Sequence, residues 1–525
     1  MMFDDMMRWQ NQIRRNTLGD LLRRVAGRSP DKTAVYFGDE MRSYAQWNRE
    51  VNRLAFGLTS IGICSGEHIG LVARNSLRFL TLVLALAKMG VVVVPVNPTL
   101  TKDEFMYIFR NAEISGVVSD AAIKDRVQAA LPQQNSVQFK ALLDGAAPGW
   151  LSWDQLFAEQ EDEYWSDVDD NYIAQILYTS GTESRPKGVI LTHRNLIDQF
   201  VSIIMAGEFR SDDVVLHALP LFHSAQLNAF FGPFLYLGAT HVLTEKPEPS
   251  RVLDLIERYR VTQFFAPPTI WIGLLRSPQF QPKRLRSLTK AVYGAAIMPT
   301  QVLKELGSKM PWIRFWNMYG MTEMAPFATS LPPEEQLTRP LSVGKPGINV
   351  EMAVLDDDER EVKRGELGEI VLRSSHAMQG YYNNPERTHE AFRYGWYHTG
   401  DVGFIDSQGY LTVVDRKKDM IKSGGENIAS REIEDVLYTH PAVLECAVLG
   451  LPHPYWIEAV TAVVVLRDEM TASAEELRDF CRARLAGYKV PKAFLFHTHL
   501  PKNASGKVLK AQLKSICERQ VNWLE

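Results

Sequence analysis

The chain has 525 residues, of which 46% are hydrophobic, and its 58 basic and 62 acidic residues give a formal net charge of −4. This length exceeds what one hydrophobic core usually supports, so two or more domains are expected. The balanced charge excludes the basic surface typical of nucleic-acid binding. The cysteines are widely spaced and contain no C-x-x-C pair, which predicts neither a zinc site nor a disulfide framework and favours a reducing cytoplasm: Cys64, Cys446, Cys481 and Cys517.

The first part of the chain alternates between strand-like and helix-like patterns. Strands are predicted at 34–37, 68–73, 91–96 and 116–118. Helices are predicted at 44–60, in a segment that ends at residue 89, and in a segment that begins at residue 103. Alternation of this kind builds a parallel sheet flanked by helices. Residues 150–170 are acidic and are interpreted as a surface connection.

No stretch of the sequence predicts a transmembrane span. The only long apolar run, residues 79–96, is broken by Lys88, Gly90 and Pro95, and it is typical of a buried helix followed by a strand. The start lacks the cationic then apolar order of a signal peptide. Residues 2–13 have near-helical apolar spacing, which favours a helix docked on the body, with contact to a membrane surface as the alternative.

A loop rich in hydroxyls and cations follows the apolar run 173–178 and precedes the apolar run 189–191. Its hydroxyls, glycine N–H groups and basic side chains are the donors that a polyanionic phosphate needs. The loop is not a Walker loop, because that pattern requires Gly-Lys-Ser/Thr at the start of a helix. A plain surface turn is the alternative interpretation of this segment: Thr179, Ser180, Gly181, Thr182, Glu183, Ser184, Arg185, Pro186, Lys187 and Gly188.

Further strands and helices follow this loop. Thr192 is predicted to cap a helix that runs to about residue 205. Strands are expected at 216–221, 238–243, 263–266, 288–293 and 314–318, and helices at 249–259 and 269–275. From 341 to 411 the strands shorten (351–355, 368–373 and 409–413), which favours a small, more twisted sheet. The charged run 415–418 predicts a linker, and after it a compact α+β module is expected from helices 430–438 and 474–485 and strands 443–450, 459–465 and 493–497.

Several short motifs, taken together and in this order, resemble those of adenylate-forming enzymes, and within that superfamily the chain resembles an acyl-CoA synthetase. The resemblance covers about residues 20 to 515, and its motifs lie at 177–188, 319–323, 397–401, 415–427 and 501–507. One departure is Glu183-Ser184, which stands where Thr-Gly is more usual. The resemblance implies an α/β protein with a large N-terminal domain (1–415) of parallel-sheet layers plus a small barrel-like sheet, a hinge (416–418) and a mobile α+β lid (419–525).

The resemblance also implies roles for individual residues. Those implied to bind ATP or AMP are Thr179, Ser180, Gly181, Thr182, Lys187, Gly294, Ala295, Ala296, Asn317, Tyr319, Gly320, Thr322, Asp401, Arg416 and Lys507. The catalytic set is Lys507, Glu323, Thr182 and Lys187, with Glu323 as the carboxylate for Mg²⁺. Lys418 is the implied hinge, and the segment implied to line the coenzyme A tunnel is Ser423, Gly424 and Gly425. Residues implied to lie near the acyl group are Phe222, His223, Phe230 and Phe231, with Phe264 and Trp271 behind them.

The implied reaction converts a carboxylic acid and MgATP into acyl-AMP and pyrophosphate, after which coenzyme A displaces AMP. A monocarboxylate with an apolar tail is favoured, because none of the implied acyl-site residues supplies a charge for a second ionic group. The small residues Gly294, Ala295 and Ala296 leave room for length, which favours a fatty acid of medium or long chain over an aryl acid. The alternatives are an aryl-CoA ligase of the benzoate or cinnamate type, a luciferase-like oxygenase, an amino-acid adenylation domain and a non-catalytic ATP sensor. The sequence leaves the acid and the oligomeric state open.

Overall fold

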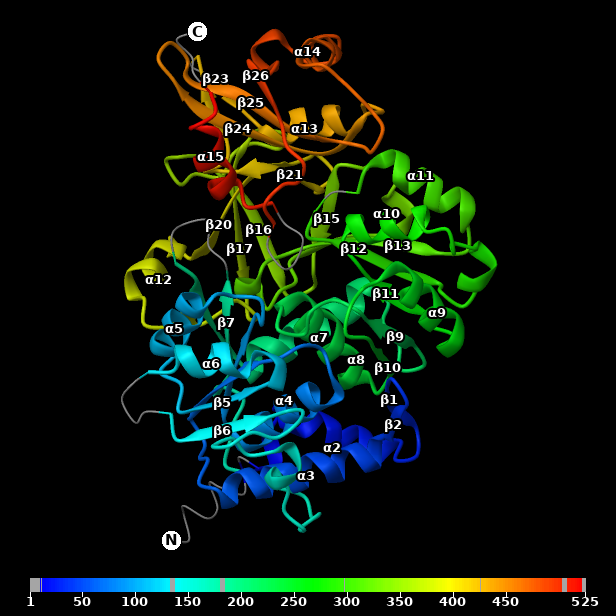
Figure 1. The fold of residues 1–525 in the computed structure, drawn as a ribbon, viewed down its shortest axis with the longest axis vertical. Coiled ribbons are helices and arrows are strands. Elements are labelled where there is room, and N and C mark those ends of the chain that lie inside the picture. Colours follow the sequence, from blue (N-terminus) through cyan, green and yellow to red (C-terminus); the bar gives the residue numbers. More distant parts are fainter. Residues whose placement is uncertain are drawn as a thin grey trace. The chain divides into compact units, whose positions relative to one another are not determined.

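The computed structural model of the protein describes residues 10, 12–132, 137–179, 185–296, 298–424, 426–502 and 508–521, without the side chain of Asn427. The chain divides into two compact units, both traced in Figure 1. Among the described residues, the first takes in those from 10 to 179, from 185 to 351 and from 373 to 392, and the second takes in those from 352 to 372 and from 393 to 521. The predicted α/β architecture is confirmed, whereas the predicted domain boundaries at 415 and 419 stay predictions.

A largely parallel sheet forms one part of the first unit. Its strands there follow the order β2-β1-β10-β9-β11-β12-β13-β14-β15, parallel from β1 to β13 and antiparallel at β2, β14 and β15. The strands are β1 (Thr33–Phe37), β2 (Glu40–Ser43), β9 (Val214–His217), β10 (Thr240–Leu243), β11 (Gln263–Phe265), β12 (Lys290–Gly294), β13 (Arg314–Tyr319), β14 (Thr329–Leu331) and β15 (Ser342–Pro346).

Both faces of this sheet are buried under helices. Alternate residues such as Leu216 and Phe264 face a core formed with α9 (Pro249–Tyr259), α10 (Pro268–Arg276) and α11 (Thr300–Lys309). The intervening residues, among them Val215 and Phe265, face a second core formed with α7 (His193–Gly207) and α8 (Gly232–Leu237). Near-continuous apolar strands are typical of parallel sheets that are covered on both sides.

A second sheet completes the first unit. Its order is β18-β8-β7-β4-β3-β5-β6, parallel from β7 to β6, with β8 and β18 antiparallel. The strands are β3 (His68–Val72), β4 (Val92–Val96), β5 (Gly116–Ser119), β6 (Phe139–Leu142), β7 (Ile173–Thr179), β8 (Lys187–Thr192) and β18 (Gly380–Tyr381). Helices α5 (Lys102–Asn111) and α6 (Lys124–Ala130) bury one face, and α12 (Pro385–Ala391) follows β18.

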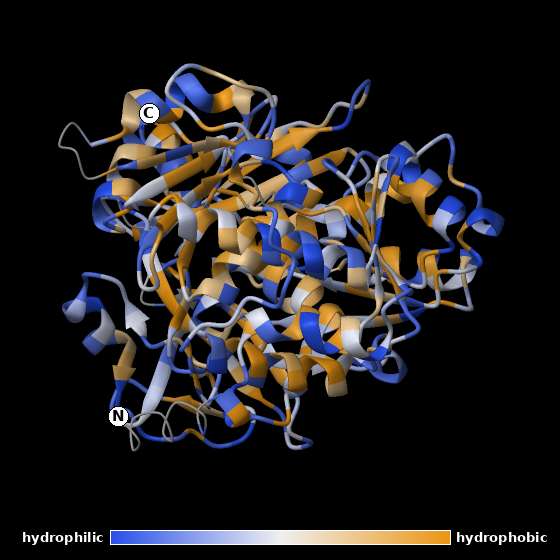
Figure 2. Cartoon of the chain, turned by 90° about the horizontal axis from the view of Figure 1, so that it is seen from below, coloured by the Kyte–Doolittle hydropathy of each residue, from blue (hydrophilic) through white to orange (hydrophobic). Residues whose placement is uncertain are grey.

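The helices between the two sheets begin at residues suited to capping. Ser43 caps α3 (Tyr44–Ser60), Ser76 caps α4 (Leu77–Met89) and Thr192 caps α7, and each hydroxyl accepts a bond from an N–H in the first turn. With α2 (Leu18–Arg28), these helices carry their apolar residues inward, and Figure 2 shows hydrophobic colour gathered along the strands and inner helix faces. A cavity of only about 20 Å³ remains where α2, α4, α7 and α8 meet β7.

The second unit contains two smaller sheets. Its first sheet has the order β16-β17-β20-β21, formed by β16 (Val350–Leu355), β17 (Gly368–Ser374), β20 (Trp396–Ile405) and β21 (Leu411–Arg416), with β19 (Phe392–Arg393) beside β20. Its second sheet contains β22 (Ile421–Ser423), β23 (Glu426–Ile428), β24 (Val443–His453), β25 (Ile457–Leu466) and β26 (Ala493–Phe496). Helices α13 (Ser430–Tyr438) and α14 (Ala474–Arg482) cover one face of it. Helix α15 (Lys510–Cys517) covers the other.

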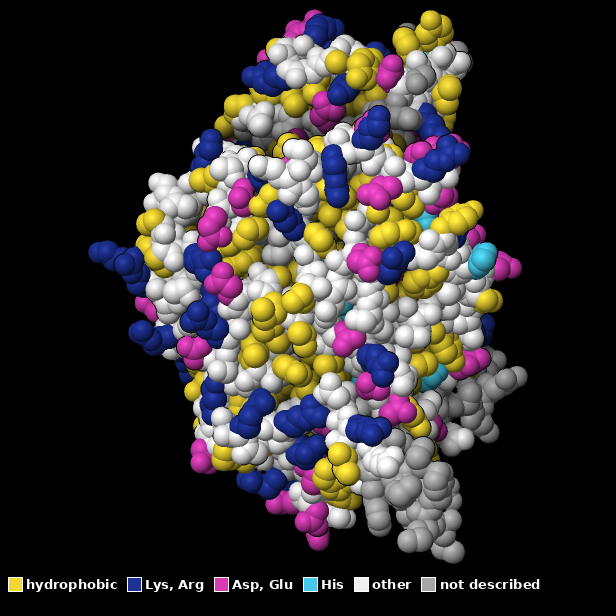
Figure 3. Space-filling view, turned by 180° about the vertical axis from the view of Figure 1, so that it is seen from behind, with side chains coloured by type: hydrophobic (Ala, Val, Ile, Leu, Met, Phe, Trp, Pro, Cys, Tyr) yellow, Lys and Arg dark blue, Asp and Glu magenta, His cyan; other side chains and the backbone are white. Residues whose placement is uncertain are grey.

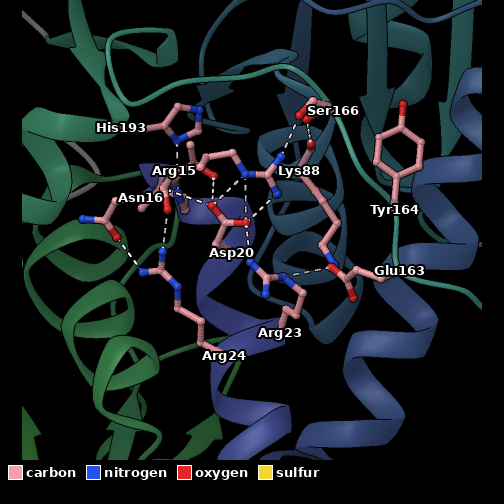
Figure 4. A network of polar contacts seen from close by, with 12 residues as sticks. Arg15, Asn16, Asp20, Arg23, Arg24, Lys88, Glu163, Tyr164, Ser166 and His193 are labelled. Atoms are coloured by element: carbon pink, nitrogen blue, oxygen red, sulfur yellow. Dashed lines mark hydrogen bonds and ion pairs between the residues drawn. The ribbon is translucent and has the colours of Figure 1, made fainter. Parts of the chain in front are cut away.

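Residues 150–170 are mostly exposed or half-buried, as a surface connection requires, but a buried polar network anchors them. Lys88 has only 1% of its side chain exposed, and its ammonium lies 2.5 Å from a carboxylate oxygen of Glu163 and 2.6 Å from the amide oxygen of Asn52. Arg15 donates to Asp20, as Figure 4 shows. The acidic segment is therefore fixed to α3 and α4, because a buried lysine needs a carboxylate partner.

Three further predictions were wrong in detail. The strand predicted at 34–37 pairs with β10 in the other sheet and not with 68–73, because sequence alternation gives no information about which strands are neighbours. Asp415 and Arg416 lie at the end of β21 and not in a linker, since Arg416 pairs with Asp401 in the ladder. The predicted strand 216–221 ends at His217.

The surface carries charges of both signs. On the face in Figure 3, basic and acidic side chains are interspersed among apolar ones. Across the described residues, no helix combines the length and hydropathy needed to cross a membrane. All four cysteines are free thiols, of which Cys64 is exposed and the other three are buried.

Candidate active site

The predicted phosphate loop is closed by a pair of neighbouring strands. Strands β7 and β8 are antiparallel, and Thr179 faces Lys187 at the open end of the ladder. Lys187 is half-buried and lies at the start of β8. Both predicted phosphate-binding residues therefore meet at the base of the loop. Ser180, Gly181 and Thr182, together with Glu183 and Ser184, lie outside the described residues.

Close packing fixes the base of this loop. A Cβ atom on Gly188 would lie 2.9 Å from Ile176 and 3.0 Å from the ring of Tyr178, so only glycine fits there. The Tyr178 hydroxyl donates to the amide oxygen of Asn111 at 2.6 Å. These contacts hold the last pairs of the ladder, and with them Lys187, in one position.

The second predicted motif begins at the end of β13. Asn317 is buried, and its amide nitrogen donates to the carbonyl oxygen of Ser342 at 3.0 Å. The protein thus uses one of the two N–H donors of this amide, and the implied nucleotide contact of Asn317 stays a prediction. Tyr319 is half-buried, and Gly320 cannot be replaced without a shift, because an added Cβ would lie 1.8 Å from the Pro326 carbonyl oxygen.

The small residues at the end of β12 have a steric explanation. An added Cβ on Gly294 would lie 2.4 Å from the carbonyl oxygen of Met318 on β13. Ala295 follows with a φ of +63°, a left-handed conformation that is strained for a residue with a Cβ atom. Ala295 and Ala296 are exposed, so this turn offers a small-residue surface beside the end of β13.

Glu323 and Lys187 are brought together by a residue that the motifs did not indicate. Thr322 is buried at the start of a short 3₁₀ turn that carries Glu323. The hydroxyl of Tyr381 donates to a carboxylate oxygen of Glu323 at 3.0 Å. The ammonium of Lys187 lies 5.1 Å from the centre of the same ring. Tyr381 is separated from Glu323 by 58 positions, so the sequence contains no local signal for this contact.

The predicted acyl-binding residues lie at the start of, and within, an unexpected π-helix, Ala225–Phe231. Phe222 and His223 are half-buried just before it, and burial lowers the pKa of His223, which favours the neutral ring. Phe230 and Phe231 are each 2% exposed. Their neighbours are core side chains: Phe230 stacks on Phe265 and Phe231 contacts Trp47, His217 and His241. Phe264 and Trp271 also lie in a core.

Buried amides hold this π-helix in place. Gln175 on β7 accepts a bond from the Asn228 amide at 2.9 Å. With its amide oriented to suit its neighbours, Gln199 on α7 donates to the carbonyl oxygens of Asn228 and Ala325 at 3.0 and 3.1 Å. π-Helical turns are rare and occur frequently at functional sites. Gln199 thus joins the predicted acyl region to the segment that carries Glu323.

In the second unit, Asp401 and Arg416 face each other across β20 and β21. The Arg416 Nε lies 3.6 Å from the Asp401 Oδ1, and the Asp401 side chain is 13% exposed. The Thr399 hydroxyl accepts a bond from the Asp401 N–H at 3.0 Å and donates to the Ile370 carbonyl at 2.7 Å. Asp401 and Arg416, both implied to bind the nucleotide, therefore lie side by side.

The predicted hinge and tunnel segments follow directly. Lys418 lies in the turn after β21, where the N–H of Asp419 returns to the Arg416 carbonyl at 2.9 Å. Ser423 pairs with Glu426 at the end of the antiparallel ladder between β22 and β23. Gly424 has a φ of +59° and its N–H donates to the Trp456 carbonyl at 3.0 Å. Gly425 and Lys507 lie outside the described residues.

Comparison with known proteins relates this geometry to a family. The model described as "AMP-binding enzyme" matches residues 22–382, and that described as "AMP-binding enzyme C-terminal domain" matches residues 432–507. A feruloyl-CoA synthase from Amycolatopsis sp. is 35% identical over 96% of this chain and 99% of its own length. The long-chain-fatty-acid–CoA ligase FadD13 from Mycobacterium tuberculosis (strain H37Rv) is 34% identical over 95% of this chain and 98% of its own. The crystal structure of ATP-bound MatB from Rhodopseudomonas palustris has a TM-score of 0.88 at 29% identity, covering 96% of this chain and 100% of that one.

Proposed function

Because the chain belongs to the AMP-binding family of adenylate-forming enzymes and is an AMP-forming acid–CoA ligase, we propose that its substrate is a medium- or long-chain fatty acid. The acid attacks the α-phosphorus of ATP, and the bond from that phosphorus to pyrophosphate breaks. The thiol of coenzyme A then attacks the acyl carbon, and AMP leaves. Both steps need an adenylate site that is shielded from water. We assign this site to the small-residue turn of Gly294, Ala295 and Ala296 beside the end of β13.

The first half-reaction uses the loop between β7 and β8. Phosphoryl and nucleotidyl transfer depend chiefly on positioning and on neutralising charge. Thr179, Lys187 and the loop residues between them contact the β- and γ-phosphates. Thr322 contacts the α-phosphate, and Lys507 bridges it to the acid.

Glu323 fits a role toward the magnesium ion that accompanies ATP. Magnesium bound with a nucleotide keeps several waters and needs only one or two protein carboxylates. A half-buried glutamate whose carboxylate is already oriented by the Tyr381 hydroxyl meets this need. Among the residues with described positions, no group of three or more His, Cys, Asp and Glu side chains could hold a metal ion. When bound, the ion withdraws charge from the phosphates.

The ribose and the second half-reaction involve the second unit. Asp401 accepts bonds from both ribose hydroxyls, and Arg416 neutralises its charge beside the sugar. The turn at Lys418 changes conformation between the two steps, which withdraws Lys507 and brings the segment at Gly424 to the pantetheine arm. A mobile lid allows two chemistries to share one pocket.

The preference for an apolar monocarboxylate follows from the charge of the acyl site. Phe222 is apolar and His223 is neutral, so neither supplies a partner for a second carboxylate or an amine. Small side chains at 295 and 296 leave room for a long substrate. An aryl acid is the second candidate, favoured by the 35% identity to a feruloyl-CoA synthase.

A series of straight-chain acids tests the proposed substrate. Each buried methylene contributes roughly 0.8 kcal/mol, which corresponds to about a fourfold gain in affinity. We therefore expect kcat/KM to rise a few-fold per methylene from acetate upward and to level off where the tail reaches solvent. A profile that is flat from acetate to dodecanoate would contradict the fatty-acid proposal, and ferulate or benzoate exceeding every fatty acid would favour the aryl candidate.

A further inference from the structure

We propose that Tyr381 is a positioning residue for the adenylation step, holding the Glu323 carboxylate with its hydroxyl and the Lys187 ammonium over its ring. This inference rests on the proposed roles of Glu323 toward metal-bound ATP and of Lys187 toward the phosphates. It adds a residue that lies outside the motifs and connects two of them through one side chain.

Strand pairing sets the position of Tyr381 relative to Lys187. Strand β18 is antiparallel to β8, with Tyr381 opposite Val189. Side chains two residues apart on a strand share a face, so Lys187 lies on the same face as Val189 and diagonal to Tyr381. A lysine ammonium 5.1 Å from a tyrosine ring centre is within the range of a cation–π contact.

Main-chain bonds set the position of Tyr381 relative to Glu323. The N–H of Met378 donates to the Glu323 carbonyl oxygen at 2.8 Å, and the N–H of Gln379 donates to Ile190 on β8 at 3.0 Å. The segment 378–381 thus joins the chain at Glu323 to β8. The hydroxyl of Tyr381 then reaches the carboxylate of Glu323 at 3.0 Å.

The backbone of Tyr381 is itself held firmly. Its N–H donates to the Thr388 hydroxyl at 2.9 Å. The preceding Gly380 has a φ of +149°, and an added Cβ there would lie 2.8 Å from Thr388. Tyr381 is 8% exposed, so its ring has little freedom to turn. Because the Tyr381 hydroxyl is held in one position, it can orient the Glu323 carboxylate through a bond to one carboxylate oxygen.

The two contacts of Tyr381 have different consequences for ligand binding. A hydroxyl bonded to one oxygen of a carboxylate fixes the orientation in which the other oxygen meets a metal ion, and partners of this kind typically change metal affinity or activity 10- to 100-fold. The ring face holds the Lys187 ammonium near the loop whether or not a metal is present. The hydroxyl should therefore matter only for metal-bound ATP, and the ring for both forms.

Calorimetric binding of ATP in the absence of acid separates these effects. Tyr381→Phe should raise the Kd of MgATP roughly tenfold and leave that of metal-free ATP, measured with EDTA, unchanged. Tyr381→Leu should also weaken metal-free ATP about two- to fivefold. Tyr382→Phe is the matched control. Tyr382 is the next residue in the chain, and its hydroxyl donates to a different carboxylate, that of Glu113, at 2.8 Å. It should change neither Kd.

Glu323→Gln distinguishes failure of this inference from failure of the proposed function. If Glu323→Gln weakens MgATP and Tyr381→Phe does not, the role of Tyr381 is wrong while that of Glu323 stands. If neither variant changes MgATP binding, the metal role of Glu323 is wrong, and the inference falls with it. Equal weakening of MgATP and metal-free ATP by Tyr381→Phe would indicate a general structural role and would also overturn the inference.

Discussion

Arg416 faces Asp401 across β20 and β21, with its Nε 3.6 Å from the carboxylate Oδ1. A carboxylate so placed can accept two hydroxyl bonds while its charge stays balanced. Asp401→Asn should weaken AMP binding roughly 10- to 100-fold, the scale for losing a charged hydrogen-bond acceptor. Calorimetric titration with AMP measures the Kd of the original protein and of the variant.

The control for Asp401 is another carboxylate paired with arginine. Glu351 lies 3.0 Å from Arg373 in an exposed pair. Glu351→Gln should leave AMP affinity within twofold of the original, because exposed ion pairs contribute little. If both variants lose the same AMP affinity, Asp401 has no specific role in binding the nucleotide.

The turn after β12 gives a prediction about stability. Gly294→Ala places a Cβ 2.4 Å from the Met318 carbonyl oxygen, which should destabilise the fold by about 1–3 kcal/mol and slow acid-dependent ATP–pyrophosphate exchange. Ala295→Gly relieves a φ of +63° and should be neutral or stabilising by up to ~1 kcal/mol. Urea unfolding measures the free energy of unfolding of both variants. We expect it to fall in Gly294→Ala and to stay the same or rise in Ala295→Gly. Destabilisation by both would contradict the strain assigned to Ala295.

The π-helix gives a prediction about the choice of acid. Gln199→Met removes the donor to the carbonyl oxygens of Asn228 and Ala325, which should cost about 1–3 kcal/mol per unpaired buried group. We expect the ratio of kcat/KM between long and short acids to change several-fold while the KM for ATP stays nearly constant. Met205→Ala, on the exposed face of the same helix, should change neither value. If the ratio of kcat/KM between long and short acids is unchanged in Gln199→Met, the π-helix does not determine which acid is used.

His193 gives a prediction about pH. Its Nδ1 accepts a bond from the Leu18 N–H at 3.2 Å, and burial lowers the pKa of His193 to about 4. In the unfolded chain the imidazole titrates near 6.5, so the unfolded state binds more protons between these values. The contribution of His193 to stability should therefore fall by on the order of 3 kcal/mol as the pH drops from about 6.5 to 4. Burial also lowers the pKa of other histidines, which add to the drop: His217, His223, His241 and His376. His193→Gln should remove only the His193 contribution from the profile measured by urea unfolding.

Asp20 predicts a second, more acidic transition. Burial alone would raise the pKa of Asp20, but the guanidinium groups of Arg15 and Arg23 bring it down to about 2. Its stabilisation is present above pH ~3.8 and is lost as the pH falls through about 2. Asp20→Asn should thus leave the drop between pH 6.5 and 4 intact. A profile in which Asp20→Asn removes that drop would contradict the assignment of the drop to the buried histidines.

Much of the fold could be predicted because its elements carry strong local patterns. Helices 44–60, 249–259 and 430–438 were predicted with the bounds that the structure has, since their apolar residues recur with helical periodicity. The sheet to which a strand belongs is a long-range property, and β1 was assigned to the wrong sheet for that reason. The edge strand β6 was missed, because a run of only four residues is too short to be distinguished from a loop by its hydrophobic pattern.

The candidate site was predictable only where its residues occur in short motifs. Thr179 and Lys187 meet as expected from the loop that they close. Tyr381 reaches Glu323 only through strand pairing, and Gln199 reaches Asn228 only through packing, so neither contact has a sequence signal. Phe230 and Phe231 were assigned to the acyl site, but core packing surrounds their rings.

The most direct test of the central claim is ATP–pyrophosphate exchange measured with and without a carboxylic acid, in the absence of coenzyme A. Because acyl-AMP forms before the thiol is needed, exchange should depend on the acid and proceed without coenzyme A. Lys507→Ala should lower it by about 10²-fold or more, while thioester formation from supplied acyl-AMP continues. Exchange that strictly requires coenzyme A, or that proceeds equally without an acid, would contradict the account.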